Sequence, residues 1–121
     1  MTQKKVMLVE DDPTMRSLLK TLLELEKLQV IAKTDMQEEN ILSVIFDEQP
    51  DVLIMDVNLR TTSGIAVLQQ LRSKPNAPTT KVLMVSGQDL RQECINAGAD
   101  GFLMKPYMPT ELIQWIRTAI Q

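Results

Sequence analysis

Five polar residues in this sequence have the chemical character needed for phosphoryl chemistry, and each follows a short apolar run. Glu10 and Asp11 follow the first of four such runs, Asp56 the second, Ser86 the third and Lys105 the fourth. Three carboxylates that lie close together repel one another and favour a bound cation, and Mg²⁺ prefers such oxygen ligands. A carboxylate beside a divalent cation can attack phosphorus to form an acyl phosphate. The residue types therefore indicate an acidic pocket in which Lys105 and the Ser86 hydroxyl stabilise phosphoryl charge.

The composition argues against several other kinds of site. The chain contains no histidine, so it lacks a histidine-based catalytic dyad, a histidine metal site and a phosphohistidine of its own. A net charge of −3 argues against direct binding of nucleic acid, because counterion release needs a clustered basic face. No apolar run is long enough for a membrane span or a secretory signal, so we expect a cytoplasmic protein. The lone Cys94 is expected to be a small, half-buried hydrophobic residue.

Short apolar runs predict the strands of a sheet. Each run has too few residues for a helix and no alternation of polar and apolar side chains, which is typical of strands buried on both faces of a parallel sheet. Four runs have this character: Val6–Val9, Val52–Met55, Val82–Val85 and Phe102–Met104. A fifth and more mixed segment, Gln29–Lys33, suits a strand nearer the edge.

Segments with helical periodicity lie between these strands. Apolar residues spaced i, i+3, i+4, i+7 and i+8 over residues 15–23 form one helix face, and Asp12 and Pro13 suit the cap and first residue of that helix. The last helix is predicted over Thr110–Ile120, with its first residue as the cap. The other three helices are indicated by Ile41, Val44 and Ile45, by Ile65, Leu68 and Leu71, and by Leu90–Ala97 before Gly98.

Strand and helix alternate five times, which predicts an α/β fold. The expected architecture is a doubly wound, five-stranded parallel sheet of order 2-1-3-4-5 with helices on both faces, the flavodoxin-like arrangement. Such sheets bind ligands outside the carboxyl ends of their strands, so the polar residues that follow the strands should converge in one crevice. With 121 residues the chain has the size of one domain, and we expect residues 1–121 to form a single domain.

Each of these polar residues also has an ordinary structural interpretation when taken alone. An acidic pair before a helix often only caps it, because anions favour helix N-termini. Asp56 suits a turn, Ser86 a loop start and Lys105 a solvated strand end. Four strand ends that carry this set of groups in this order nevertheless favour the functional interpretation.

Four stretches of the sequence form a specific combination: VMLVEDDPTMR, VLIMDVNL followed by Gly64, VLMVSG, and AGADGFLMKP. Through them the chain resembles the receiver domains of two-component response regulators over nearly its whole length. The resemblance implies a receiver fold in which Asp56 is the phosphorylated residue. It also implies an Mg²⁺ ion whose protein ligands are Glu10, Asp11, Asp56 and the backbone carbonyl of Asn58.

The resemblance implies roles for the other residues of the pocket. Ser86 resembles the switch hydroxyl and Lys105 the phosphate-binding lysine of the family. Phe102 resembles the aromatic switch residue that turns inward when the hydroxyl moves toward the phosphoryl group, although a plain core aromatic suits it equally well. The Lys105–Pro106 bond resembles one that is cis in the family.

Two segments depart from the family pattern. Arg60 stands where many relatives have proline, and Thr61–Ser63 replace the usual loop, so the approach to Asp56 is expected to differ. The interval from Ser86 to Lys105 is about one helical turn shorter than usual, which shortens the fourth helix or the loop before it.

The function implied by the resemblance is that of a phosphoacceptor signalling domain. A histidine kinase or phosphotransfer protein would donate the phosphoryl group, and a switched surface would then bind an output protein that the sequence does not identify. No enzyme activity is implied beyond self-catalysed phosphoryl acceptance and slow self-dephosphorylation. A homodimer through the fourth helix, fifth strand and fifth helix is an open alternative for that surface, although the shortened helix argues against its standard form.

Other functions stay open as alternatives. A constitutive interaction module of the same fold would no longer use phosphorylation, but the retention of every pocket group argues against it. A phosphatase with an aspartyl-phosphate intermediate usually needs a second carboxylic acid near the nucleophile, and Asn58 stands two residues after Asp56. An electron carrier of the flavodoxin type is disfavoured by an aromatic content of 3%. Trp115 is expected to be a half-buried packing residue, with a partner anchor as the alternative.

Overall fold

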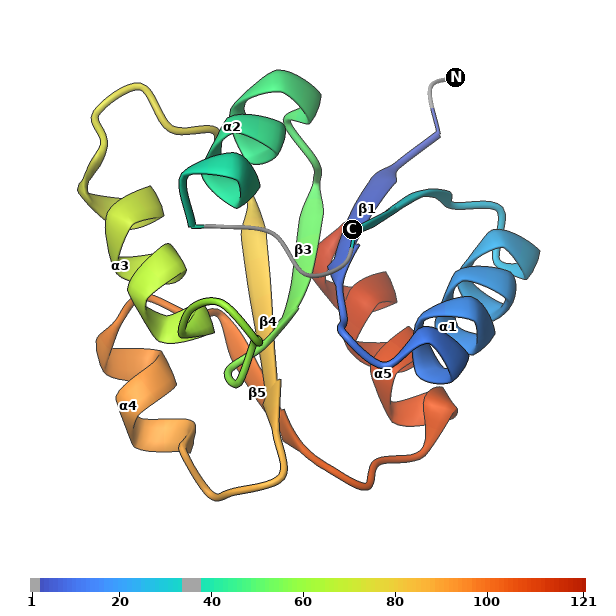
Figure 1. Ribbon diagram of the computed structural model, residues 1–121. Helices are drawn as coiled ribbons and strands as arrows, with labels where there is room; N and C mark the ends of the chain where they lie inside the picture. Colours follow the sequence, from blue (N-terminus) through green and yellow to red (C-terminus); the bar gives the residue numbers. More distant parts are fainter. Residues whose placement is uncertain (1–2, 34–37) are drawn as a thin grey trace.

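The computed structural model describes residues 3–33 and 38–121, in which strand and helix alternate along the chain (Figure 1). The elements are β1 (Lys5–Val9), α1 (Pro13–Leu25), β2 (Gln29–Lys33), α2 (Glu38–Glu48), β3 (Val52–Asp56), α3 (Gly64–Ser73), β4 (Lys81–Ser86), α4 (Arg91–Asn96), β5 (Gly101–Met104) and α5 (Pro109–Ala119). All neighbouring strands pair in parallel, in the order β2-β1-β3-β4-β5. The predicted doubly wound sheet and its strand order are therefore confirmed.

The sheet separates two apolar layers. Helices α1 and α5 cover one face, and α2, α3 and α4 cover the other (Figure 1). Successive side chains of a strand point to opposite faces, so Met7 and Val9 of β1 pack in one layer while Val6 and Leu8 pack in the other. The central strand β3 is buried along its whole length, whereas the edge strand β2 is only partly buried, as its mixed sequence predicted.

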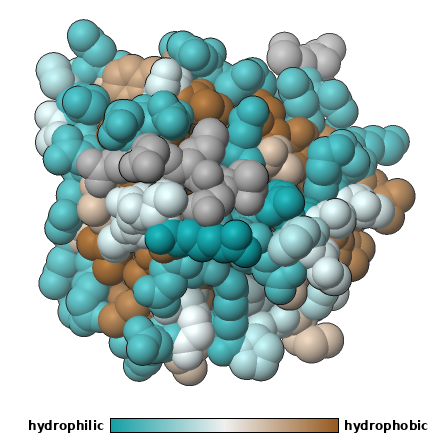
Figure 2. All heavy atoms as spheres, in the orientation of Figure 1, coloured by the Kyte–Doolittle hydropathy of each residue, from teal (hydrophilic) through white to brown (hydrophobic). Residues whose placement is uncertain are grey.

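The surface of the molecule is mainly polar. Figure 2 shows one face on which hydrophilic side chains predominate and hydrophobic ones are scattered. The exposed large hydrophobic side chains that the structure describes include Leu18, Leu25, Ile95, Met104 and Met108. Among the described residues, no helix combines the length and the apolar character that crossing a membrane requires.

Helix α1 begins as predicted. The Asp12 side chain accepts hydrogen bonds from the backbone N–H groups of Thr14 (2.9 Å) and Met15 (3.3 Å), and Pro13 is the first helical residue. These bonds satisfy two of the N–H groups that the first turn of a helix leaves without a partner. The cap therefore fixes the point at which the chain leaves the acidic pair and enters the helix.

The predicted start of the last helix is wrong. Thr110 lies inside α5, whose cap residue is Met108 and whose first residue is Pro109. The Glu111 carboxylate reaches back and accepts a hydrogen bond from the Met108 N–H at 3.1 Å. Proline favours the first helical position, because its fixed φ suits the helix and its missing N–H is not needed there, so the cap is Met108, two residues before Thr110.

Helix α4 has only six residues, in line with the shortened interval between Ser86 and Lys105. Gly98 follows it with φ of 107°, a left-handed conformation that glycine adopts readily. Cys94 on this helix is fully buried, so the prediction of a half-buried residue is wrong. Its side chain belongs to the same core layer as Phe102 and Val82.

Trp115 of α5 is half-buried and packs on the core, as predicted. Its indole lies against Gly101 at the start of β5, where the β-carbon of any larger residue would clash with the ring. The small residue in the strand therefore allows the helix to approach the sheet closely.

Candidate functional site

The carboxyl ends of β1, β3, β4 and β5 meet at one edge of the sheet. Val9, the last residue of β1, lies beside Met55, and Asp56 lies beside Val85. Ser86 at the end of β4 lies beside Met104 at the end of β5. Because the residues that follow these ends are Glu10, Asp11 and Lys105, the register brings the predicted polar groups to a single crevice.

Lys105 joins two carboxylates at the centre of this crevice. Its Nζ lies 2.5 Å from Asp56 Oδ2 and 3.3 Å from Glu10 Oε1. Glu10 is 4% exposed and Asp56 is 9% exposed, so both acids are buried beside this cation. Lys105 thus contacts both predicted acids, although it lies 95 positions after Glu10 in the sequence.

The pKa of Lys105 is raised above its ordinary value. Burial alone would lower the pKa, because it penalises the charged ammonium, but hydrogen bonds and charge interactions with Asp56 and Glu10 outweigh that effect. Lys105 is therefore a cation at neutral pH and offsets part of the negative charge of the pocket.

Further hydrogen bonds hold Glu10 and Asp56 in place. The Asp12 N–H donates to Glu10 Oε2 at 3.1 Å, and the Arg16 guanidinium donates to the Glu10 carbonyl at 2.9 Å. The Asn58 N–H donates to Asp56 Oδ1 at 3.0 Å. Each oxygen of Asp56 therefore has a partner, Lys105 on one side and a backbone amide on the other.

Asp11 differs from the other two acids. Its Oδ2 accepts a hydrogen bond from the Arg60 backbone N–H at 2.8 Å. Its Oδ1 is buried and has no hydrogen-bond partner among the residues that the structure describes. A buried carboxylate oxygen without a partner is unfavourable, so this atom marks a position where a cation would be stabilising.

The donor set suits Mg²⁺ without forming a complete cage. Within residues 3–33 and 38–121, no three Asp, Glu, Cys or His side chains gather closely enough to constitute a metal centre by themselves. Mg²⁺ typically takes only one or two carboxylates and fills its other positions with water and phosphate oxygens. The carboxylates of Asp11 and Asp56 therefore suit this cation, since Asp11 Oδ1 has no partner among the described residues. The full predicted ligand set of Glu10, Asp11, Asp56 and Asn58 stays a prediction.

The two predicted switch residues, Ser86 and Phe102, are both buried. Ser86 is fully buried, and its hydroxyl accepts a hydrogen bond from the Gln88 N–H at 3.1 Å. The Lys105 N–H donates to the Ser86 carbonyl at 2.8 Å, which ties the ends of β4 and β5 together. Phe102 is 4% exposed and points into the core, with the Arg91 guanidinium 5.4 Å from its ring centroid. The Lys105–Pro106 bond is cis, as the resemblance implied.

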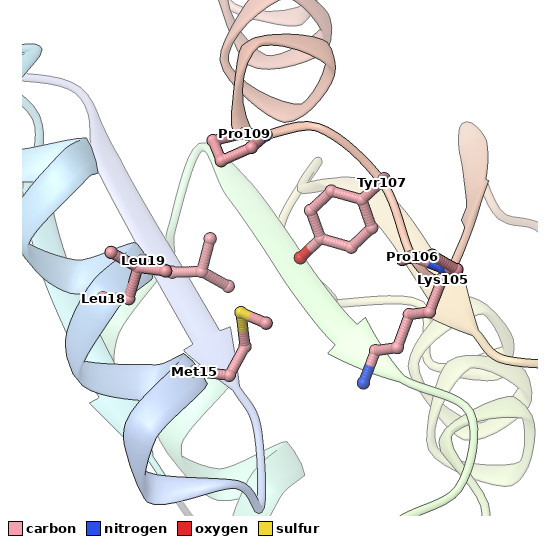
Figure 3. A pocket seen from close by; sticks show the side chains of 7 residues that line it. All are labelled: Met15, Leu18, Leu19, Lys105, Pro106, Tyr107 and Pro109. Atoms are coloured by element: carbon pink, nitrogen blue, oxygen red, sulfur yellow. The ribbon is translucent and has the colours of Figure 1, made fainter.

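A cavity of about 510 Å³ opens beside Lys105, between α1 and the loop that leads into α5 (Figure 3). Its wall is mainly apolar and is formed by Met15, Leu18, Leu19, Lys105, Pro106, Tyr107 and Pro109. The Tyr107 hydroxyl is buried without a partner among the described residues, and burial raises the pKa of this phenol.

Two features of the site were missed from the sequence. The first is the hydrogen bond from the Arg60 backbone N–H to Asp11. The sequence contained a signal for it, because a residue other than proline at position 60 has a backbone N–H to donate. Tyr107 follows Lys105 and Pro106 directly, so its place next to the pocket could have been inferred from that short spacing.

Comparisons with known proteins agree with this geometry. The sequence profile of the response regulator receiver domain matches residues 6–117. The nitrate/nitrite response regulator protein homolog of Haemophilus influenzae is 35% identical over 121 residues, which covers 97% of this chain and 57% of that relative. The chain spans about half the length of the curated relatives it matches.

Solved structures show the same architecture. The response regulator signal receiver domain from Bermanella marisrubri superposes with a TM-score of 0.89 at 25% identity and covers 99% of this chain and 100% of that one. The CheY-like receiver domain from Methylobacillus flagellatus has a TM-score of 0.81 at 30% identity, with coverage of 98% and 99%. From the profile match, the relatives and the shared fold, we conclude that this chain belongs to the response regulator receiver domain family and is the receiver domain of a two-component response regulator.

Proposed function

We propose that residues 1–121 act as one phosphorylation-gated signalling domain in which Asp56 accepts a phosphoryl group from a phosphohistidine donor. The observation that carries this proposal is the contact of Lys105 Nζ with both Asp56 and Glu10. A cation held against a buried carboxylate at a strand end suits a site where phosphoryl charge arrives. The donor is a histidine kinase, the partner that the family implies, or a phosphotransfer protein.

The transfer is a substitution at phosphorus. A carboxylate oxygen of Asp56 forms the new P–O bond, the P–N bond to the donor imidazole breaks, and its electron pair stays on the imidazole nitrogen. The Asn58 N–H on Oδ1 and the Lys105 ammonium on Oδ2 hold the Asp56 carboxylate in one orientation. Phosphoryl transfer spreads negative charge over the equatorial oxygens of the phosphoryl group. The Lys105 ammonium moves from Asp56 to these oxygens and stabilises their charge.

Glu10, Asp11, Asp56 and the carbonyl of Asn58 would hold Mg²⁺, which supplies positive charge that lowers the repulsion between the acids and an incoming phosphoryl group. The buried Asp11 Oδ1 without a partner supports this assignment.

The switch would act through the end of β4. Ser86 is buried beside the pocket, and its hydroxyl retains a proton that it can donate to a phosphoryl oxygen. Movement of Ser86 would break its bond with the Gln88 N–H and shift the loop before α4, whose first residue, Arg91, lies over the Phe102 ring. The surface formed by α4, β5 and α5 would then change its affinity for an output protein or a second copy of the chain, a two-state response to a local charge.

The test is incubation with a small phosphodonor and Mg²⁺, followed by intact mass measurement. We expect the gain of one phosphoryl group, abolished by Asp56→Ala or by removal of Mg²⁺. Asp47→Ala is the matched control, because it removes an exposed carboxylate on α2 and should leave phosphorylation unchanged. A protein that gains no phosphoryl group, and binds its partner equally well with a phosphoryl mimic, would instead be the constitutive module.

A further inference from the structure

The Asp11 carboxylate is held by the backbone of a loop distant in sequence. The Arg60 N–H donates to Asp11 Oδ2 at 2.8 Å and so joins the β1–α1 loop to the β3–α3 loop. The β3–α3 loop is itself ordered, because the Leu59 N–H donates to the Thr62 carbonyl at 3.2 Å and Asn58 pairs with Ser63 as an antiparallel bridge. The fold therefore fixes the position of this donor.

The second oxygen of Asp11 differs from the first. Oδ1 is buried and unpaired within the described part of the chain. Lys105 contacts Glu10 and Asp56, and no contact between its ammonium and Asp11 is present among these hydrogen bonds. The hydrogen bond at Oδ2 restricts rotation of the carboxylate, so Oδ1 keeps one direction.

We propose that the Arg60 backbone N–H is a positioning group that aims Asp11 Oδ1 at Mg²⁺, an inference that rests on the proposed function. Partners that hydrogen-bond to a metal ligand fix its orientation, and their loss typically weakens metal binding by about 10- to 100-fold. The donor here is a main-chain amide, so any residue at position 60 supplies it except proline, which has no N–H. This receiver domain therefore has a support for its metal ligand that a chain with proline at this position lacks.

The decisive comparison is Arg60→Pro against Arg60→Ala. Both variants lose the guanidinium charge, but only Arg60→Pro loses the N–H. We expect calorimetric titration with Mg²⁺ alone to show binding about tenfold weaker for Arg60→Pro than for Arg60→Ala. Equal dissociation constants, or tighter binding by Arg60→Pro, would overturn the inference and leave the proposed function intact.

A second measurement, on the wild type and Asp11→Ala, does not depend on how Arg60→Pro folds. Hydrogen exchange followed by NMR should show an Arg60 amide that is protected without Mg²⁺, loses its protection in Asp11→Ala, and keeps it at saturating Mg²⁺. Loss of protection on adding Mg²⁺ would mean that metal and amide compete for Oδ2, which contradicts a positioning role. If the wild-type chain bound no Mg²⁺, the proposed function and this inference would both fail.

Discussion

At the scale of single residues, Lys105 governs the electrostatics of the pocket. Its ammonium is the cation in contact with Glu10 and Asp56, and its side chain is 30% exposed while theirs are 5% and 12% exposed. Burial of two acids next to each other is costly unless a positive charge accompanies them. A lysine, which has a flexible stem and a compact charge, suits this position, because in the proposed function its ammonium moves with a phosphoryl oxygen.

Lys105→Met should therefore destabilise the protein. We expect the free energy of unfolding at pH 7 without Mg²⁺ to fall by about 1–3 kcal/mol, below the usual cost of breaking a fully buried pair because Lys105 is partly solvated. Mg²⁺ should restore part of the loss, since it supplies charge to the same acids. Urea unfolding with and without Mg²⁺ measures both effects, with Lys81→Met on the exposed end of β4 as the control. Equal stability of Lys105→Met and wild type would refute this account of the lysine.

The buried thiol of Cys94 gives a prediction about pH. Burial, with a smaller contribution from the charge of Glu93, raises the pKa of this thiol above its ordinary value of 9.0. A group whose pKa is raised by folding contributes its full stabilisation below the unfolded pKa and loses it as the pH rises through the folded pKa. We expect the free energy of unfolding to decline more steeply above pH 9.0 in the wild type than in Cys94→Ala. Parallel pH profiles from urea unfolding would contradict this expectation.

At the scale of elements, Arg72 ties three segments together at the sheet edge opposite the pocket. Its guanidinium donates to the Gly98 carbonyl at 3.0 Å, to the Thr80 carbonyl at 3.1 Å and to Asp100 Oδ2 at 2.9 Å. Asp100 Oδ2 also accepts from the Val82 N–H at 2.8 Å. The end of α3 is thereby joined to the start of β4 and to the α4–β5 loop.

Gly98→Ala tests this junction. The substitution places a β-carbon 2.8 Å from Arg72 Cγ on a residue whose φ is 107°. We expect a loss of about 1–3 kcal/mol in the free energy of unfolding, because a strained backbone conformation and a displaced arginine act together. Gly87→Ala is the control, since a β-carbon there meets no atom within 4 Å. A Gly98→Ala variant as stable as Gly87→Ala would show that the junction tolerates a side chain.

The elements also show which features of the sequence were informative. The cap of α1 followed from Asp12 and Pro13 because capping depends on residues that are adjacent in the chain. The start of α5 was misplaced because threonine is a common cap, whereas the proline before it occupies the first helical position. The burial of Cys94 was underestimated because a helix of six residues has too little periodicity to define its buried face.

At the scale of the whole molecule, the fold could be predicted because parallel strands impose strong patterns. Apolar runs without alternation identify strands covered on both faces, and the strand order then brings the strand ends together. The convergence of Glu10, Asp56 and Lys105 followed from that topology. The contact between Arg60 and Asp11 did not, because it uses a backbone N–H and depends on the conformation of a loop, which no pattern of side chains records.

The most direct measurement of the central claim is chemical trapping of the acyl phosphate. Borohydride reduces an aspartyl phosphate to homoserine, so treatment after incubation with a phosphodonor and Mg²⁺ marks the residue that carried the phosphoryl group. Peptide mass spectrometry should find homoserine at position 56, in an amount that increases with Mg²⁺ until the site is saturated. Homoserine at position 11, or no reduced residue at saturating Mg²⁺, would contradict the assignment of Asp56 as the phosphoacceptor.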